Sequence, residues 1–259
     1  MVDDRPLVVR VEESFIPVYG VGETTERDLW RAGITHWDAF DPSAVGSTTA
    51  DRIQAYIDDA RESLAAGDTT FFAEQFPSQA RWRLYETFRD NAAFLDIETT
   101  GLDQYRDDVT TVSVRLGGET TTLVRGQDLT ADRLRDVVCD ADMLVTFNGA
   151  RFDVPFLESA FEVNGLFDRP HLDVMYPCRR LDLTGGLKRI ERDLGVERDR
   201  PDLSGEDAVR LWREFQRGDD GALETLVSYN REDVDHLETV TERVVSRLHA
   251  DIVPEDCPL

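Results

Sequence analysis

The chain has 259 residues, 41% of them hydrophobic, which is enough for one large domain or two ordinary ones and excludes wholesale disorder. Its 53 acidic and 29 basic residues give a formal net charge of −24. No apolar run approaches the ~18 residues of a membrane span, the start lacks a signal peptide's apolar stretch, and the scattered cysteines exclude a disulfide framework or zinc ribbon. We therefore expect a soluble, cytoplasmic protein without a membrane partner.

The first ninety or so residues are predicted to form helices separated by turns. A glycine turn at Gly20–Gly22 leads into a helix that starts at Glu23, and helical patterns follow over Asp51–Leu64 and Pro77–Phe88. Gly67 separates the last two patterns. No internal repeat is predicted, and this segment is expected to be a small helical domain.

Behind a boundary near residue 90 the pattern changes to strands alternating with helices, which predicts an α/β domain. Gly117-Gly118 predicts a hairpin turn between the second and third strands. The predicted strands are Ala92–Ile97, Val109–Leu116, Thr120–Val124, Met143–Phe147 and His171–Val174. The predicted helices are Thr130–Cys139, Val154–Glu162, Gly186–Leu194, Glu206–Gln216 and Ala222–Leu248.

Two acidic residues, Asp96 and Glu98, stand at the end of the first predicted strand. Residues i and i+2 of a strand leave the same face, with Cα atoms roughly 6.6 Å apart. Two adjacent anions at the end of a covered strand need a neutralising cation, and hard oxygen ligands suit Mg²⁺ or Mn²⁺. The alternative is an exposed strand end in an acid-rich protein.

Two further segments place acidic residues at defined points of predicted elements. Asp153 follows Asn148-Gly149 at a helix start, where it is either a metal ligand or an ordinary N-cap, and Asn148-Gly149 is alternatively a simple turn. Tyr229 and Asp233 are four residues apart on a late helix and therefore share a face. A solvated acidic face is the alternative for this helix.

The charge does not exclude a nucleic-acid substrate. Lys188 is the only lysine among the 29 basic residues, and this acidic, lysine-poor composition is similar to that of proteins from salt-accumulating cytoplasms. At ~1 M salt the Debye length is roughly 3 Å, so distant repulsion between carboxylates and phosphates nearly vanishes.

The order of these motifs resembles the DEDD exonucleases of the ribonuclease H-like superfamily. Closer resemblance to the YprB-type branch lies in Gly186–Glu191, Leu194-Gly195 and Leu203–Trp212, and the likeness covers residues 91–248. It implies a ribonuclease H-like mixed sheet flanked by helices over 91–250, after a helical domain over 1–90 and before a tail at 251–259. Because Ser228 stands where the histidine branch of the family has its histidine, this chain resembles the tyrosine (DEDDy) branch.

The resemblance also implies a site with two divalent ions, Mg²⁺ or Mn²⁺. Asp96 would bridge both ions, Glu98 and Asp233 would complete one site, and Asp153 would support the other. Tyr229 would orient the attacking water, since a phenol with a normal pKa near ~10 is a poor general base. The candidate substrate-binding residues are Thr99, Asn148 and Lys188, and for Lys188 an ordinary surface lysine is the alternative.

These expectations define a metal-dependent nuclease that hydrolyses phosphodiester bonds, with 3′→5′ exonuclease action on single strands or frayed ends of DNA or RNA. One alternative is a nucleic-acid-binding ribonuclease H-like module with weak or no catalysis, and another is an endonuclease. Residues 16–40 resemble a helix-hairpin-helix element, which would present helix-terminal amides to a phosphate backbone or serve only as a packing subdomain.

Overall fold

The computed structural model describes residues 8–161, 169–254 and 257, which form two compact units. The first unit comprises residues 1–89 and 243–259, and the second comprises residues 90–242. Residues 243–250, predicted with the α/β domain, are thus grouped with the first unit. Glu162 at the end of one predicted helix lies outside the described residues, as does the start of the chain. Within the described residues, no helix is both long and apolar enough to cross a membrane.

The first unit is helical, as the sequence predicts, but differs in detail. The pattern over Pro77–Phe88 forms a 3₁₀ helix over Ser78–Leu84 followed by one turn of α-helix over Tyr85–Phe88, and the four consecutive residues from Trp82 to Tyr85 are buried. A short helix capped by Asp68 was not predicted. The α-helices are α1 (Glu23–Arg31), α2 (Ser47–Ala66), α3 (Thr69–Gln75) and α4 (Tyr85–Phe88). The 3₁₀ helices are η1 (Val11–Glu13), η2 (Trp37–Ala39), η3 (Pro42–Ala44), η4 (Ser78–Leu84) and, at the unit boundary, η5 (Arg89–Asn91).

The starts of α1 and α2 share a sequence pattern, so the prediction of no internal repeat is wrong here. Val-Gly-x-Thr-Thr-x-x-x-Leu/Ile begins at Val21 and recurs at Val45. In both copies the glycine is the N-cap, in extended conformation and without a side-chain cap. Between residues 16 and 40, all of them described, α1 is the one α-helix, and the 3₁₀ turn η1 precedes it.

A buried ion pair lies at the centre of the first unit. Arg83 and Glu26 are 1% and 0% exposed, and Arg83 Nη1 lies 2.5 Å from Glu26 Oε2. The other oxygen, Oε1, accepts hydrogen bonds from the Ser14 hydroxyl and the Phe15 and Ile16 amides. This one carboxylate therefore ties α1 and η4 to the segment at residues 14–16.

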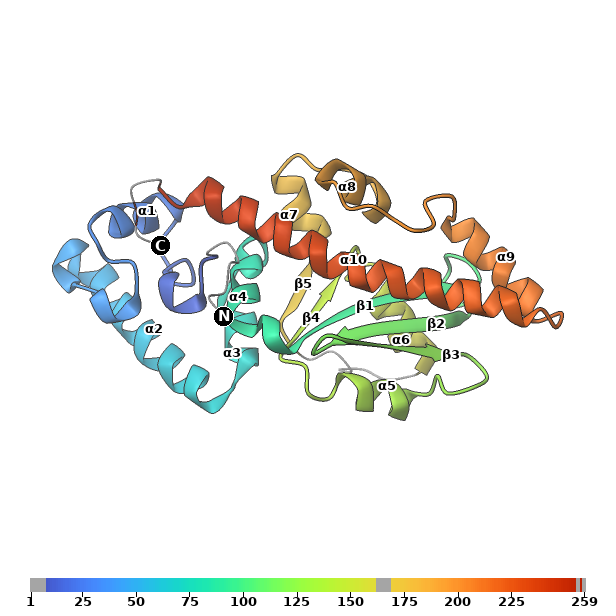
Figure 1. The fold of residues 1–259 in the computed structure, drawn as a ribbon. Coiled ribbons are helices and arrows are strands. Elements are labelled where there is room, and N and C mark those ends of the chain that lie inside the picture. The colour runs from blue at the N-terminus through green and yellow to red at the C-terminus, as the bar shows by residue number, and fades with distance from the viewer. Residues whose placement is uncertain (1–7, 162–168, 255–256, 258–259) are drawn as a thin grey trace. The chain divides into compact units, whose positions relative to one another are not determined.

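The second unit contains a five-stranded mixed sheet of order β3-β2-β1-β4-β5 (Figure 1). β1 and β2 are antiparallel, as are β2 and β3, whereas β4 is parallel to both β1 and β5. Gly117 and Gly118, both at positive φ, form the predicted hairpin turn between β2 and β3. The strands are β1 (Ala92–Thr99), β2 (Val109–Leu116), β3 (Glu119–Val124), β4 (Met143–Thr146) and β5 (His171–Asp173).

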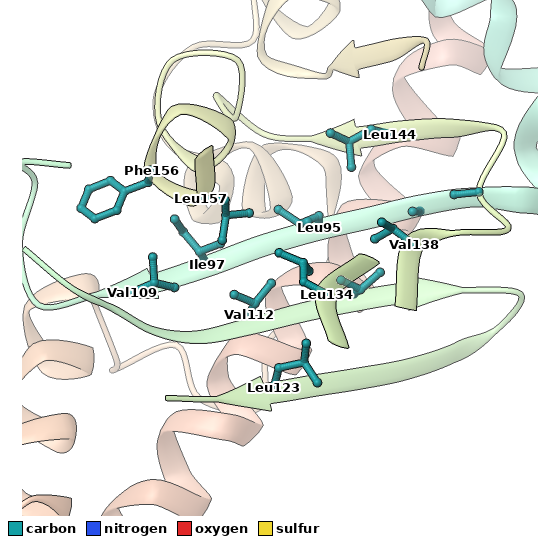
Figure 2. Close-up of a cluster of buried hydrophobic side chains, with 13 residues drawn as sticks. Leu95, Ile97, Val109, Val112, Leu123, Leu134, Val138, Leu144, Phe156 and Leu157 are labelled. Atoms are coloured by element: carbon teal, nitrogen blue, oxygen red, sulfur yellow. The ribbon is translucent and has the colours of Figure 1, made fainter. Parts of the chain in front are cut away.

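Helices flank this sheet, which confirms the predicted fold class. A core on one face joins β1 and β2 to two helices, as Figure 2 shows for Leu95 and Ile97 beside Leu134, Phe156 and Leu157. The helices are α5 (Ala131–Val138), α6 (Asp153–Phe161), α7 (Met175–Arg180), α8 (Leu187–Leu194), α9 (Gly205–Phe215) and α10 (Asp220–Ile252). Of these, only α7 was not predicted. Because the side chains of β1 alternate, the residues between those core positions face away from α5 and α6.

Candidate active site

The alternation of β1 presents Asp96 and Glu98 on the face opposite the core. Leu95 and Ile97 are packed into that core, so the two acidic side chains emerge together on the other side. The pairing of β1 with β2 changes register between Glu98 and Thr99. Such irregularities re-aim side chains at the ends of strands.

Helix α10 supplies the third carboxylate. Oxygen atoms of Asp96, Glu98 and Asp233 all lie within 4.8 Å of one another. Asp233 is 6% exposed, and Tyr229, one turn earlier on the same face, is also 6% exposed. The structure therefore brings together three of the four predicted metal ligands and the predicted tyrosine.

Asp153, the fourth predicted ligand, is the first residue of α6 and is 4% exposed. Its Oδ1 accepts a hydrogen bond of 3.2 Å from the backbone N–H of Ile97, between the two acidic residues of β1. The side chain is thus directed to β1, whereas the N-cap alternative would have used it within its own helix.

The turn before α6 requires its particular residues. Asn148 has a φ of 64°, and its backbone N–H donates to Asp173 Oδ1 at 2.8 Å. A Cβ added at Gly149 would overlap the Thr146 side chain. Asp173 also accepts from the amides of Ala150 and Met175, so it braces the turn that positions Asp153.

Sequence reasoning missed one polar residue at the centre of the site. Asn230, which is 0% exposed, donates from Nδ2 to Asp96 Oδ2 at 2.7 Å. Its Oδ1 accepts from the Thr111 hydroxyl of β2 at 3.0 Å. The available signal was a polar residue next to Tyr229 and four residues from the apolar Leu226 and Val234 on either side.

The predicted substrate-binding residues have different surroundings. The Lys188 ammonium lies 4.5 Å from the centre of the Tyr229 ring and donates to the Leu203 carbonyl. The Thr99 hydroxyl donates to the Gly101 carbonyl. Asn148 is half-buried. Lys188 is therefore next to the acidic cluster, and Thr99 directly follows it on β1.

A family model described as the RNase H superfamily matches residues 93–245, which is more than half of the chain. The chain belongs to the RNase H superfamily. Comparison with curated proteins gives no match. The matched segment of this RNase H superfamily chain contains every acidic residue of the cluster.

Several solved structures are similar in fold. One, described as the apo form of a nuclease, has 22% identity and a TM-score of 0.46, over 64% of this chain and 76% of that one. The family B DNA polymerase of Pyrobaculum calidifontis has 18% identity and a TM-score of 0.44, over 60% of this chain and 27% of the polymerase. NrnC of Brucella melitensis with bound Mg²⁺ has 18% identity and a TM-score of 0.35, over 64% of this chain and 89% of that one.

In this RNase H superfamily chain, the electrostatics of the acidic cluster favour a bound cation. Burial raises the pKa of Asp96 and of Glu98 well above ordinary values, and the nearby Asp233 and Asp153 charges raise both further. Burial also raises the pKa of Tyr229, and Asp233 adds to this shift. Clustered carboxylates that resist ionisation in this way fit the oxygen-ligand site of a divalent metal ion.

The pKa shifts predict how the stability of the metal-free protein depends on pH. Burial raises the pKa of Asp153 to about 7 and, against the opposing effect of Arg198, that of Asp233 to about 6. Between about pH 4 and the raised pKa values of Asp153 and Asp233, the folded state holds more protons than the unfolded state. The free energy of unfolding therefore increases as the pH falls from 8 to 5.

Thermal unfolding in EDTA measures this effect. The increase in Tm between pH 8 and pH 5 is expected to be several degrees smaller in Asp153→Asn than in the wild type. For a chain of this size, each kcal/mol of unfolding free energy shifts the Tm by about 2–4 °C. Mn²⁺ favours the ionised carboxylates and is expected to reduce the wild-type gain. Equal gains in the two proteins would contradict the shift at Asp153.

Proposed function

We propose that this chain is a metal-dependent nuclease that hydrolyses phosphodiester bonds by a two-metal-ion mechanism, and that it is a 3′→5′ exonuclease of the DEDDy type, YprB branch. The main support is the cluster of Asp96, Glu98 and Asp233, whose carboxylate oxygens lie within 4.8 Å of one another although the residues come from a strand and a distant helix. Asp153 and Tyr229 beside them complete the motif set of that branch.

The four carboxylates have the chemistry to hold two divalent ions, Mg²⁺ or Mn²⁺. Asp96 would bridge the two sites, Glu98 and Asp233 would complete one, and Asp153 would support the other. When bound, the ions supply a nucleophilic water at neutral pH and neutralise charge on the phosphate. Asn230 holds one oxygen of Asp96 and so orients that carboxylate before any ligand arrives.

Tyr229 is assigned the role of orienting the attacking water. Its pKa is raised by burial and by Asp233, so the phenol stays protonated and can donate or accept a hydrogen bond without acting as a base. The four-residue spacing to Asp233 places the hydroxyl on the helix face that bears the metal ligand.

The substrate is assigned to nucleic acid, with a single strand or frayed end entering the site. Lys188, on the Tyr229 ring, would contact a phosphate through its compact ammonium group. Thr99 and Asn148, at the ends of β1 and β4, would contact the terminal nucleotide. The segment over residues 16–40 of the first unit would bind the phosphate backbone through helix-terminal amides, or serve only in packing.

A cleavage assay with the full chain, Mn²⁺ and high KCl tests this proposal. A strand labelled at its 5′ end is expected to shorten stepwise, whereas a strand labelled at its 3′ end should release labelled mononucleotide from the first time point. A circular single strand should stay intact, and EDTA should stop all reactions. DNA and RNA strands of one sequence are compared in parallel.

The same assay separates the alternatives. Cleavage of the circle as fast as of the linear strand would contradict the exonuclease assignment and favour an endonuclease. A shift in a binding gel with no cleavage of any strand would contradict the nuclease assignment and favour the binding module.

A further inference from the structure

A buried arginine lies against the acidic cluster, and sequence reasoning gave it no role. Arg198 is in the segment between α8 and α9, and its side chain is 4% exposed. The guanidinium faces Glu191, Glu232 and Asp233, and its centre lies 5.9 Å from the centre of the Tyr229 ring. An arginine in this position touches one candidate metal ligand and flanks the tyrosine.

Glu191 fixes the orientation of this guanidinium. Arg198 donates to it twice, from Nε to Oε2 and from Nη2 to Oε1, the latter at 2.6 Å. Glu191 is 1% exposed, and His236 Nδ1 lies 3.3 Å from its Oε1. A paired donor fork on a buried carboxylate leaves the planar guanidinium little rotational freedom.

The same Nη2 donates its second hydrogen to Asp233 Oδ1. Because Glu191 sets the guanidinium plane, it also sets the direction of this N–H bond. The hydrogen bond in turn sets the rotation of the Asp233 carboxylate. In the part of the chain that the structure describes, Arg198 is the only protein donor to Asp233, which leaves Oδ2 available as a ligand atom.

We propose that Arg198 is a positioning residue: held by Glu191, it fixes the Asp233 carboxylate in the orientation in which Oδ2 binds the divalent ion. This inference rests on the proposed function, because it takes Asp233 as a metal ligand. A lysine cannot replace Arg198 in this role, since one ammonium group lacks the planar fork that bridges two carboxylates.

Charge repulsion between Arg198 and a bound cation would weaken metal binding, whereas the orientation of Asp233 strengthens it. However, Glu191 compensates the arginine charge at hydrogen-bond distance, and Glu232 lies 3.6 Å from Nη1. The arginine and its carboxylate partners add no net positive charge next to the site. Loss of the orientation of Asp233 is therefore the larger effect of replacing Arg198.

Calorimetric titration of the full metal-free chain with MnCl₂ tests the proposal. Arg198→Lys keeps the charge and is expected to weaken Mn²⁺ binding by about 10–100-fold, as loss of outer-shell partners does at metal sites. The electron paramagnetic resonance spectrum of bound Mn²⁺ should change as well. Arg200→Lys is the matched control, because Arg200 lies two residues on, is exposed, and pairs with Asp202.

A second variant covers the case in which Arg198→Lys fails to fold. Glu191→Gln keeps the shape of the side chain but weakens its hydrogen bonds to the guanidinium. This variant is expected to bind Mn²⁺ several-fold more weakly than the wild type. The double variant should bind Mn²⁺ no more weakly than Arg198→Lys alone, because both changes remove one connected interaction.

The outcomes separate this inference from the proposed function. A wild-type chain that binds no Mn²⁺ would overturn the proposed function and the inference with it. Wild-type binding with unchanged or tighter binding in the folded Arg198→Lys or Glu191→Gln variant would overturn the inference alone. In that case Arg198 would only balance charge in the metal-free site.

Discussion

Replacement of Asp96 by Asn is expected to lower Mn²⁺-dependent cleavage by at least about three orders of magnitude, because the bridging ligand of both proposed ion sites loses its charge. The same change should leave the metal-free Tm equal or higher. Burial and neighbouring charges raise the pKa of Asp96, so the neutral amide removes an unfavourable anion. Gel analysis of end-labelled strands and a thermal scan in EDTA measure the two effects.

Asp235→Asn is the control for this experiment. Asp235 is on α10 close to Asp233, but it accepts from the Thr120 hydroxyl at 2.7 Å and is half-exposed, so cleavage should stay within two-fold of wild type, a ratio worth about 0.4 kcal/mol. Unchanged cleavage in a folded Asp96→Asn protein would rule out the nuclease assignment.

Replacement of Arg83 by Met is expected to destabilise the first unit by about 3–5 kcal/mol, since it leaves the buried Glu26 without its cation. Tryptophan fluorescence during urea unfolding reports mainly this unit, because it contains three of the four tryptophans, Trp30, Trp37 and Trp82. The Arg83 guanidinium lies 5.9 Å from the Trp30 ring centre and 5.4 Å from that of Trp82.

Two comparisons show whether the buried pair is responsible. Arg31→Met breaks an exposed pair with Asp28 and should cost less than about 1 kcal/mol. Exchange of Glu26 for Gln together with Arg83→Met should be less damaging than Arg83→Met alone, because no buried charge is then left unpaired. A loss of less than about 1 kcal/mol for Arg83→Met would contradict this account.

The sheet was predictable from the sequence because its signals are local. Alternation in β1 sends Asp96 and Glu98 to one face, and the glycine pair after β2 specifies a hairpin. The structure confirms both features. In the first unit the pattern over Pro77–Phe88 predicts a helix, and the structure confirms it as the 3₁₀ helix η4 followed by α4, a helix type that the spacing does not specify.

The remainder of the site depends on contacts between distant segments, which spacing does not reveal. Asp153 has the sequence context of an N-cap, and only the approach of α6 to β1 shows that its carboxylate accepts from Ile97. In the sequence alone, nothing distinguishes Arg198 from the surface arginines of this chain. Its burial follows from packing against Glu191 and α10, and its contact with Asp233 spans 35 residues of sequence.

The lone lysine has a practical consequence for chemical labelling. Apart from the chain's own α-amino group, Lys188 is the single primary amine in the sequence. Burial lowers its pKa, with Arg198 adding to the shift, and so increases the fraction of nucleophilic free amine at neutral pH. An amine-selective acylating reagent would therefore have two targets, the α-amino group and Lys188, and the group attached to Lys188 would lie within a few ångströms of Tyr229.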